Sequence, residues 1–506
     1  MKTKTLFIVI LGFLVLSIGG TAYGWQGRMG GMGDPYGLIS DESDFLIHPS
    51  GIAKGEGVKF YGNYGFTYTG VTDWSYDLDQ FNPAGTLTDF YHYDTSGQED
   101  KHNALLGAAF PLWLGRMGLF FEYDGMRGDY DGNEDTLGMS NFTKYDLTKD
   151  LDNFALRLLY GLPIGGFNLG GEVQHAYRKE ENRNFIPEYL NYFVASSHSR
   201  NLTPFQLPYD SNYWEALFKG SLEGKVGLLD LGFTLRGGFI SGGDNSLLLT
   251  QTTASIGFFD CIGDVTGWRI GGDLWARYPL TDGLTLPFLV RVDYEEKTRD
   301  GEGPGQGSFP PGLYFSYESQ EKNLHLEAGG GVDKEFGKGA RIAAGIYYNY
   351  LQGEYDITLN RITGAPWMIW DHSDYPASIE HQVMIRLAGE LELTPAVTLR
   401  MGLAPFYGWV REDFTFALGA PTNPFFTDDI SLDGYHWGIG ASLGGTIKFK
   451  SITLEPFVNG GWQQIKLNGD GERIYIAPDT ISNNLWEMDK LRKEWSIGGG
   501  LSIKFN

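Results

Sequence analysis

Cysteine is nearly absent from this chain, which has a single one, Cys261, among 506 residues. One thiol cannot form an internal disulfide or supply the cysteine sets that hold zinc or iron–sulfur clusters. No C-x-x-C-H motif, G-x-S-x-G motif or P-loop occurs, and the nine histidines are scattered without metal-binding spacing. We therefore predict no metal, no cofactor and no enzymatic activity, and we interpret Cys261 as an incidental loop residue.

Positive charge is also scarce. The 39 lysines and arginines are outnumbered by 63 aspartates and glutamates, which gives a net charge of −24. Proteins that bind nucleic acid need a basic surface, so this balance argues against a nucleic-acid partner. It does not argue against a membrane, because acidic loop residues would stand in water beyond the lipid, where divalent cations can screen them.

The chain has only one long hydrophobic run, residues 6–18, close to its N-terminus. Two lysines precede the run, and small residues stand at the −3 and −1 positions of a cleavage site after Gly24. These features predict a secretory signal peptide over residues 1–24, with a short anchor helix as the alternative. Since no later run is long enough, we expect no transmembrane helix in the rest of the chain.

Glycine and aromatic residues are abundant and fall in alternating segments. The segment 57–71, GVKFYGNYGFTYTGV, places apolar residues at one parity and mostly polar residues at the other. Period two indicates a β-strand with one apolar face, and crossing a bilayer takes roughly nine to eleven residues of tilted strand. About sixteen such segments occur: 57–71, 102–112, 117–128, 151–162, 166–179, 212–224, 227–241, 265–279, 283–297, 322–334, 339–352, 378–393, 396–411, 434–449, 451–466 and 493–505.

Short connections alternate with longer ones, such as 72–101, 180–211 and 353–377. This layout predicts an all-β protein: a transmembrane antiparallel up-and-down β-barrel of about 16 strands over residues 57–506, with short periplasmic turns and long extracellular loops. Its location would be the outer membrane of a Gram-negative bacterium. A soluble sandwich or propeller would need a second sheet over each apolar face, and the charged residues of the other parity argue against one.

Aromatic residues near the strand ends of the apolar parity resemble the two girdles of outer-membrane barrels. We predict an outer girdle of Tyr68, Tyr123, Tyr177, Tyr294, Tyr350, Trp409, Trp437, Trp462 and Trp495. The inner girdle would contain Tyr160, Phe167, Tyr278, Phe336, Phe449 and Phe505.

The region 57–506 resembles a bacterial outer-membrane porin-like barrel. Its last residues, Ile503-Lys504-Phe505-Asn506, resemble the C-terminal strand that such proteins present to the barrel-assembly machinery, although the aromatic stands one residue before the end. The resemblance implies outer-membrane lipid, lipopolysaccharide and that machinery as partners. A homo-oligomer or a periplasmic partner protein remains open.

Residues 25–56 do not alternate, and they resemble the N-terminal stretch of the outer-membrane fatty-acid transporter superfamily. The resemblance rests on Met29-Gly30-Gly31-Met32-Gly33, on an acidic run, and on His48-Pro49-Ser50-Gly51-Ile52-Ala53. In that family the stretch ends in an Asn-Pro-Ala-Gly turn, and this chain has His48-Pro49-Ser50-Gly51 in its place. The resemblance implies that residues 25–56 form a periplasmic hatch in the barrel, with His48, Pro49, Ser50 and Gly51 at its turn, and that the barrel has fourteen strands.

Charged residues of the polar parity are expected to line the lumen near mid-height. The candidates are Arg236, Asp273, Arg291, Glu327 and Arg386, with Glu122, Glu172 and Lys219 across the barrel. A mixed ring of this kind would select solutes by charge and size. The alternative is that these charges pair with one another and only solvate the wall. Bulky residues of the same parity favour a constricted or plugged lumen: Trp275, Leu289, Tyr347, Phe406 and Phe457.

Two of the expected loops could have roles of their own. Loop 180–211 is rich in aromatic residues and could fold into the lumen, or it could stay at the surface or contact a partner. Loop 129–136 spaces Asp129, Asp131, Asn133 and Asp135 like calcium ligands. Glu134 stands where an EF-hand loop needs glycine, so a solvated acidic turn is the alternative.

We expect an outer-membrane channel that lets small solutes diffuse through a charged, constricted lumen. One alternative is a transporter of hydrophobic compounds with an N-terminal hatch. Another is a barrel that sheathes a periplasmic partner such as a multihaem cytochrome. The residues do not identify the solute.

Overall fold

The computed structural model describes residues 32, 37–39, 42–136, 143–185, 209–252, 255–307, 314–337, 339–363, 373–420, 423–477 and 480–505. Sixteen strands account for almost all of them. They are β1 (Lys59–Phe81), β2 (Leu87–Leu112), β3 (Gly115–Thr136), β4 (Thr143–Ile164), β5 (Phe167–Phe185), β6 (Tyr209–Val226), β7 (Leu229–Thr252), β8 (Ser255–Thr281), β9 (Leu284–Gly307), β10 (Tyr314–Phe336), β11 (Ala340–Thr363), β12 (Ser373–Thr394), β13 (Val397–Ala420), β14 (Asn423–Phe449), β15 (Ile452–Ala477) and β16 (Thr480–Phe505).

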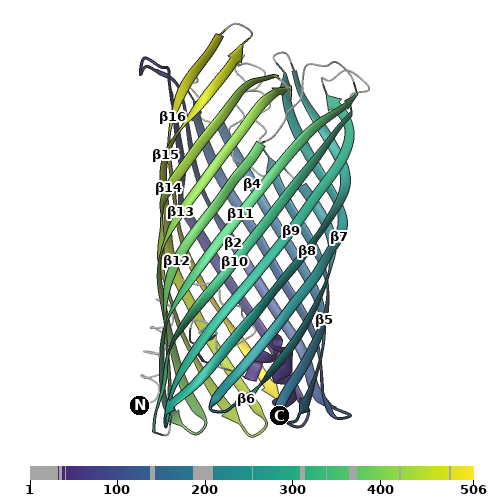
Figure 1. Ribbon diagram of the computed structural model, residues 1–506, viewed down its shortest axis with the longest axis vertical. Coiled ribbons are helices and arrows are strands. Elements are labelled where there is room, and N and C mark those ends of the chain that lie inside the picture. The colour runs from purple at the N-terminus through teal and green to yellow at the C-terminus, as the bar shows by residue number, and fades with distance from the viewer. Residues whose placement is uncertain are drawn as a thin grey trace, which may run out of the picture.

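Each strand pairs antiparallel with its sequence neighbours, and β1 pairs with β16, so the sheet closes into a barrel (Figure 1). The predicted fold class and the count of sixteen strands are confirmed, and the fourteen strands implied by the family resemblance are wrong for this chain. Closure pairs the backbone groups of every strand on both sides, so no sheet edge is left exposed to lipid. β1 begins and β16 ends at the end of the barrel that carries the short turns, where Phe60 pairs with Phe505.

Two short 3₁₀ helices, η1 (Glu42–Leu46) and η2 (Pro49–Lys54), precede the barrel. Among the described residues, no helix is long and apolar enough to span a membrane. The predicted signal peptide lies outside the described residues.

The strands are longer than the apolar pattern indicated. The expected loop 72–101 is wrong: β1 continues to Phe81, β2 begins at Leu87, and a turn over 82–86 joins them. The other expected long loops are also largely strand in the described residues. The reason is physical: the contrast between apolar and polar faces ends where lipid ends, but the backbone hydrogen bonds between neighbouring strands continue above it.

Three smaller expectations change for the same reason. The calcium segment 129–136 lies within β3, where Asp129 pairs with Gln98 and Asp131 with Ser96. Alternate residues of an extended strand are spaced about 6.6 Å apart in a line and cannot surround one ion, so neither a calcium loop nor an acidic turn is present. Cys261 belongs to β8 and not to a loop. Loop 180–211 begins in β5 and ends in β6, and residues 186–208 lie outside the described residues.

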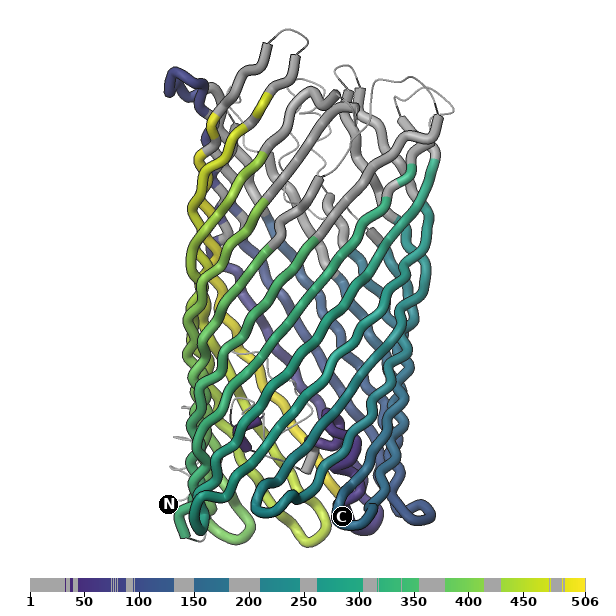
Figure 2. The backbone as a smooth tube through the Cα atoms, viewed as in Figure 1, coloured from purple at the N-terminus to yellow at the C-terminus, as the bar shows by residue number. Residues whose placement is uncertain are grey.

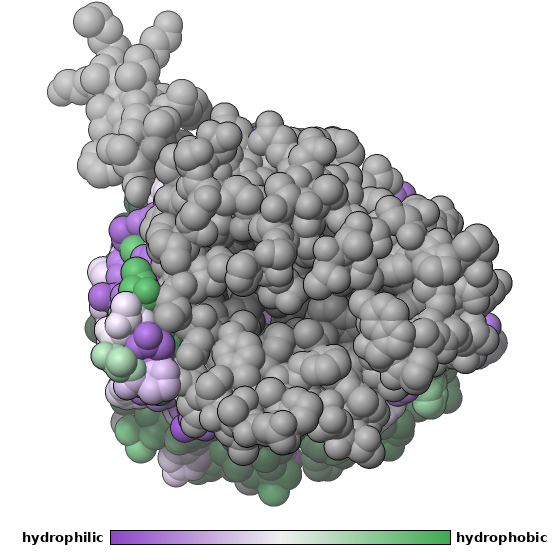
Figure 3. Space-filling model, turned by 90° about the horizontal axis from the view of Figure 1, so that it is seen from above, coloured by the Kyte–Doolittle hydropathy of each residue, from purple (hydrophilic) through white to green (hydrophobic). Residues whose placement is uncertain are grey.

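The outer face of the wall carries exposed apolar side chains, for example Phe66, Leu106 and Phe121. Green hydrophobic side chains are visible around the outside of the wall when the barrel is seen from above (Figure 3). A closed barrel with such a band spans a membrane, and the protein is an outer-membrane barrel.

Aromatic pairs mark the outer border of this band. Tyr68 packs against Trp495, Trp268 against Tyr294, and Trp437 against Trp462, with ring centroids 5.2, 5.0 and 4.5 Å apart. These rings stand about ten residues above the periplasmic strand ends; at about 3.3 Å per residue and a tilt near 40°, that is a rise of about 25 Å. This is the height of the apolar band of such barrels, so the strands continue well beyond the membrane on the extracellular side.

Candidate functional site

The described part of the segment that precedes β1 lies inside the barrel near its periplasmic end and packs against the wall. We call the described part of this segment, Met32, residues 37–39 and residues 42–54, the plug. It lies inside the lower part of the barrel as the purple section of the tube (Figure 2). Its side chains Phe45, Leu46 and Ile52 form one apolar cluster with four inward residues of the wall: Leu105, Ala109, Phe120 and Leu159.

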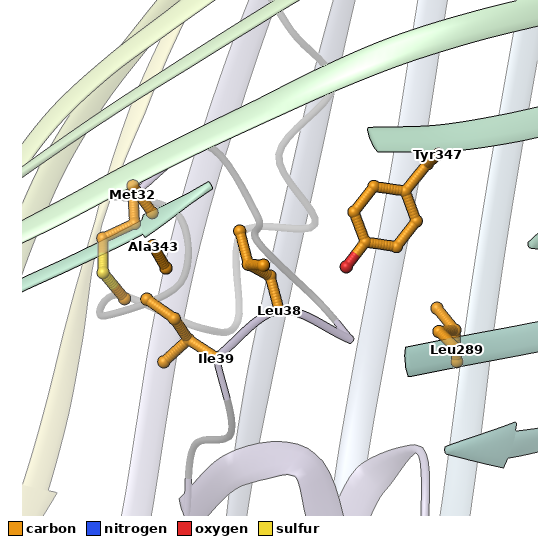
Figure 4. Close-up of a cluster of buried hydrophobic side chains, with 7 residues drawn as sticks. Met32, Leu38, Ile39, Leu289, Ala343 and Tyr347 are labelled. Carbon is orange, nitrogen blue, oxygen red and sulfur yellow. The ribbon is translucent and has the colours of Figure 1, made fainter. Parts of the chain in front are cut away.

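A second apolar cluster lies on the opposite side of the plug. Met32, Leu38 and Ile39 pack with wall residues from β9, β11 and β12: Leu289, Ala343, Tyr347 and Ala388 (Figure 4). Trp275 packs against the rim of this cluster. The inward orientation expected for Trp275, Leu289 and Tyr347 therefore has a structural reason, since these side chains contact the plug.

Glycines in the wall leave room for the plug. A Cβ atom added to Gly170 would lie 2.0 Å from the backbone nitrogen of Ser50, and one added to Gly402 would lie 2.0 Å from the carbonyl oxygen of Met32. At Gly118 and Gly161 an added Cβ would come within 2.6 Å of the Ile52 side chain. Wall and plug are therefore complementary in shape, which fits a resident segment of the barrel.

Wall cations also hold the plug through its backbone. Arg157 Nη2 and Lys219 Nζ donate to the carbonyl oxygen of Leu46 at 2.5 and 3.0 Å. Leu46 is the last residue of η1, where carbonyls lack partners within the helix. On the other side, Arg277 Nη1 donates to the carbonyl oxygen of Leu38 at 3.1 Å.

The four residues expected at the turn of the hatch lie at the centre of the plug. His48, Pro49 and Ser50 are buried, and Gly51 packs against Phe45. The Ser50 backbone N–H donates to Ser221 Oγ at 2.6 Å.

His48 is the one titratable group at this turn. Its Nδ1 lies 2.5 Å from Thr234 Oγ1, and its ring packs against Trp275 at 6.0 Å. Burial lowers the pKa of His48 from 6.5 to about 4; Asp273 opposes this shift, and the cations Arg291, Lys219 and Arg236 add to it. His48 is therefore neutral in the plugged barrel at neutral pH.

All eight side chains expected in the charged ring belong to ion-pair networks just above the plug. In the first network, Arg157 bonds Glu172 at 2.9 Å and Glu122 at 3.1 Å, and Lys219 lies 3.2 Å from Glu172. Arg157, which pairs with both glutamates, is the centre of this network.

The second network continues the ring over β7 to β12. Asp273 binds Arg236 and Arg291, each at 2.7 Å, and Glu327 binds Arg386 at 2.6 Å. Arg291 and Glu327 are 3.7 Å apart, which links the two pairs.

One member of this network, Asp293, was missed in the sequence although it shares the face of Arg291. Its Oδ1 accepts from Arg236 Nε at 2.5 Å across the whole width of β8. Gly271 makes the crossing possible, because an added Cβ there would lie 2.3 Å from Asp293 and 2.8 Å from Arg236. The ring charges are thus paired with one another, as the alternative to a selectivity ring expected. Selection of solutes by the ring stays a prediction.

The ring does not run evenly around the lumen. At the height of the networks, the inward positions of β13 to β16 are small or uncharged, including Gly402, Gly440, Gly461 and Gly498. Phe406 and Phe457, the remaining bulky residues expected to point inward, belong to this sector. The inward glycines of β13 to β16 carry no charge, whereas charged pairs of these strands, such as Arg400 with Glu455 at 3.6 Å, stand at neighbouring positions.

A cavity of about 730 Å³ lies between the plug and the wall on the periplasmic side. Its lining combines apolar residues, among them Phe45, Ile52 and Trp275, with charged ones such as Lys54 and Arg116. Arg116 is 5% exposed, and its two hydrogen bonds, to the carbonyl oxygens of Gly57 and Ala109 at 2.6 and 3.4 Å, both go to backbone. Among the residues that the structure describes, none accepts a hydrogen bond from its Nε.

A second cavity, of about 630 Å³, lies above the ring. Side chains of both signs line it, including Arg269, Glu295 and Glu412, together with Leu217 and Val410. Within the part of the chain that the structure describes, no group of three or more histidine, cysteine, aspartate or glutamate side chains could hold a metal ion.

No protein-family model and no curated protein sequence matches this chain. Its fold is similar to that of a FadL homologue from Pseudomonas aeruginosa, with 13% identity over 96% of this chain and 98% of that chain and a TM-score of 0.44. A deltaS2 mutant of the TodX monoaromatic hydrocarbon channel has 11% identity, the same two coverages and a TM-score of 0.43. The Pseudomonas putida toluene transporter TodX has 11% identity over 97% of this chain and 99% of that chain, with a TM-score of 0.40. At these values the similarity concerns the barrel fold.

Proposed function

We propose that this chain is an outer-membrane transporter for hydrophobic or amphiphilic compounds and that the plug must move before a compound can pass. The observation that carries the proposal is the cavity between plug and wall. It offers apolar side chains, Phe45, Ile52 and Trp275, next to the buried guanidinium of Arg116. Binding sites for small molecules are typically clefts of this kind, mostly apolar with a few fixed polar groups.

The inward glycines of β13 to β16 support the same proposal. A hydrophobic compound that passed the charged networks would have to replace their ion pairs or avoid them. The wall of β13 to β16 offers a passage past them, since its inward glycines carry no charge and Phe406 and Phe457 add apolar surface. Arg236 and Asp293 of the second network also line the upper cavity.

The other two functions are less well supported. Free diffusion of small solutes needs an open lumen, whereas the plug packs against both sides of the wall. A sheath around a periplasmic multihaem protein needs the same space at the periplasmic end, which the plug fills.

A reversible lock on the plug tests the proposal. In a background with Cys261→Ser, the pair Ser50→Cys and Ser221→Cys would join plug to wall where the Ser50 N–H now meets Ser221 Oγ. Liposomes that contain the oxidised protein should take up a radiolabelled apolar aromatic compound at the protein-free rate. Reduction should restore uptake.

A matched control is the pair Asn63→Cys and Ser502→Cys, which joins β1 to β16 without touching the plug. This variant should transport equally well in oxidised and reduced form. The proposal is wrong if the plug lock leaves uptake of the apolar compound unchanged, or if a sugar of similar size enters as fast as that compound.

A further inference from the structure

The barrel has a local irregularity on its outer surface where β1 leaves the membrane. The pairing of β1 with both β16 and β2 shifts register after Val71, so Thr72 forms a β-bulge. A bulge bends its strand and interrupts the even surface of the sheet. The residues around it therefore do not form the smooth wall seen elsewhere in the apolar band.

Four residues in one cross-strand row meet at this place. Gly70 of β1 is paired with Trp495 of β16 on one side and with Gln98 of β2 on the other, and Gln98 is paired with Asp129 of β3. Because Gly70 has no side chain, the indole of Trp495 lies over its backbone; an added Cβ would be 2.5 Å from that ring. The row thus has an aromatic ring at one end, polar groups at the other and a gap between them.

This gap is a groove of about 480 Å³ on the outside of the barrel. Tyr68 and Trp495 form its aromatic wall, with ring centroids 5.2 Å apart, and Tyr68 OH donates to Gln98 Oε1 at 2.8 Å. The polar rim consists of exposed side chains: Thr72, Ser96, Gln98, Asp129 and Asp131. A volume in the range of roughly 300–1,000 Å³ is usual for small-molecule sites.

The position of the groove limits what can reach it. Tyr68 and Trp495 belong to the aromatic border of the apolar band, so the groove opens at the height of the outer-leaflet headgroups. The outer surface of the wall, not the lumen, forms it. A ligand would therefore come from the membrane surface around the barrel, and the transport path would not supply it.

We propose that this groove binds a sugar ring in the headgroup of an outer-leaflet glycolipid. The C–H groups on one face of a pyranose carry partial positive charge and pack on the electron-rich face of an indole or phenol ring. Its hydroxyl groups donate to carboxylates and exchange hydrogen bonds with an amide, which Asp129, Asp131 and Gln98 supply. The acyl chains would lie along the apolar wall below.

The composition of the rim favours sugar over the phosphate groups of the same headgroups. Asp129 and Asp131 would repel a phosphate, whereas they accept from a hydroxyl or from the ammonium group of an amino sugar. A plain glycerophospholipid offers phosphate and no sugar ring. The groove is therefore expected to distinguish glycolipid from phospholipid.

The test measures how many lipids the purified, detergent-solubilised full-length barrel retains, by native mass spectrometry during titration with rough-type lipopolysaccharide. Gln98→Ala combined with Asp129→Asn removes rim hydrogen bonds and leaves the aromatic wall. We expect one lipopolysaccharide to bind about tenfold more weakly, because two modest hydrogen bonds are lost. Gly70→Ala, which pushes the indole into the groove, should have a similar effect.

Trp437→Leu is the matched control, because Trp437 belongs to the same aromatic border but lines no part of the groove. It should leave the titration unchanged. Deacylated core oligosaccharide should compete for the site, and phosphatidylglycerol should not. The proposal fails if the oligosaccharide does not compete at any concentration, if phosphatidylglycerol competes equally well, or if the rim variants, shown to be folded by heat-dependent migration in gels, bind like the wild type.

Discussion

Arg157 of β4 donates to the carbonyl oxygen of Leu46 at 2.5 Å, so a charge in the wall holds the end of the first plug helix. The same guanidinium pairs with Glu122 and Glu172. The network in the wall and the plug are therefore joined through one side chain.

The variant Arg157→Gln should loosen the plug. It removes a charge-assisted hydrogen bond, and such bonds contribute about 1.5–3 kcal/mol. Limited proteolysis of residues 42–54 from the periplasmic side of reconstituted barrels should then be at least about tenfold faster. Arg411→Gln, which alters an exposed ion pair with Asp413 in the same strand, should leave the cleavage rate unchanged. Equal cleavage of both variants would show that Arg157 does not hold the plug.

A methyl group at Gly170 should expel the plug. The added Cβ would overlap the backbone at Ser50, and backbone cannot move aside as a flexible side chain can. In planar bilayers, Gly170→Ala should show steady conductance where the wild type is mostly closed. Gly220→Ala on the neighbouring strand adds the same methyl group where nothing lies within 4 Å, and it should remain closed. A closed Gly170→Ala channel would mean that the plug is not seated as described.

Acid should weaken plug binding through His48. The pKa of His48 is about 4 in the plugged barrel and 6.5 in a released, solvated segment. The released form thus binds more protons between these values, so the free energy of release is largest above pH 6.5 and falls as pH drops toward 4. The full change is about 3 kcal/mol.

Single-channel open probability recorded between pH 7.5 and 4 would measure this effect. It should rise below pH 6.5 in the wild type and stay nearly flat in His48→Gln, which keeps a polar group opposite Thr234 but cannot be protonated. If the two profiles coincide, other groups govern the response to acid.

The charged ring should set ion selectivity once the plug is out. In the Gly170→Ala background, Asp273→Asn leaves Arg236 and Arg291 without their shared carboxylate. The reversal potential in a salt gradient should move toward that of an anion-selective pore. Asp300→Asn removes the same charge from the exposed outer face and should not move the potential. If the reversal potential shifts equally in both variants, the ring does not determine ion selectivity.

Period-two patterning was enough to predict the barrel, its sixteen strands and, inside the alternating segments, a lipid face and a lumen face. The reason is that lipid and lumen impose opposite demands on successive residues, as Phe66 and Thr67 illustrate: one is exposed on the apolar band and the other is buried inside. The same signal disappears above the membrane, which is why a long loop over 72–101 was expected between β1 and β2.

Partners within the lumen could not be predicted in this way. Alternation of apolar and polar residues constrains only how adjacent strands pair. Arg236 of β7 and Asp293 of β9 meet across the strand between them, β8. They can do so because Gly271 of β8 has no side chain in the way. Arg157 and the Leu46 carbonyl are brought together by barrel closure around a segment that has no repeating pattern.

The amino-acid sequence by itself thus determined the architecture of this protein, because the two faces of every strand meet different solvents. Only the tertiary structure decided how the plug is seated against the wall, that the ring charges are paired, and that a bulge opens a groove on the outer wall. Each of these depends on distances between residues far apart in the chain, and such distances exist only once the barrel has closed.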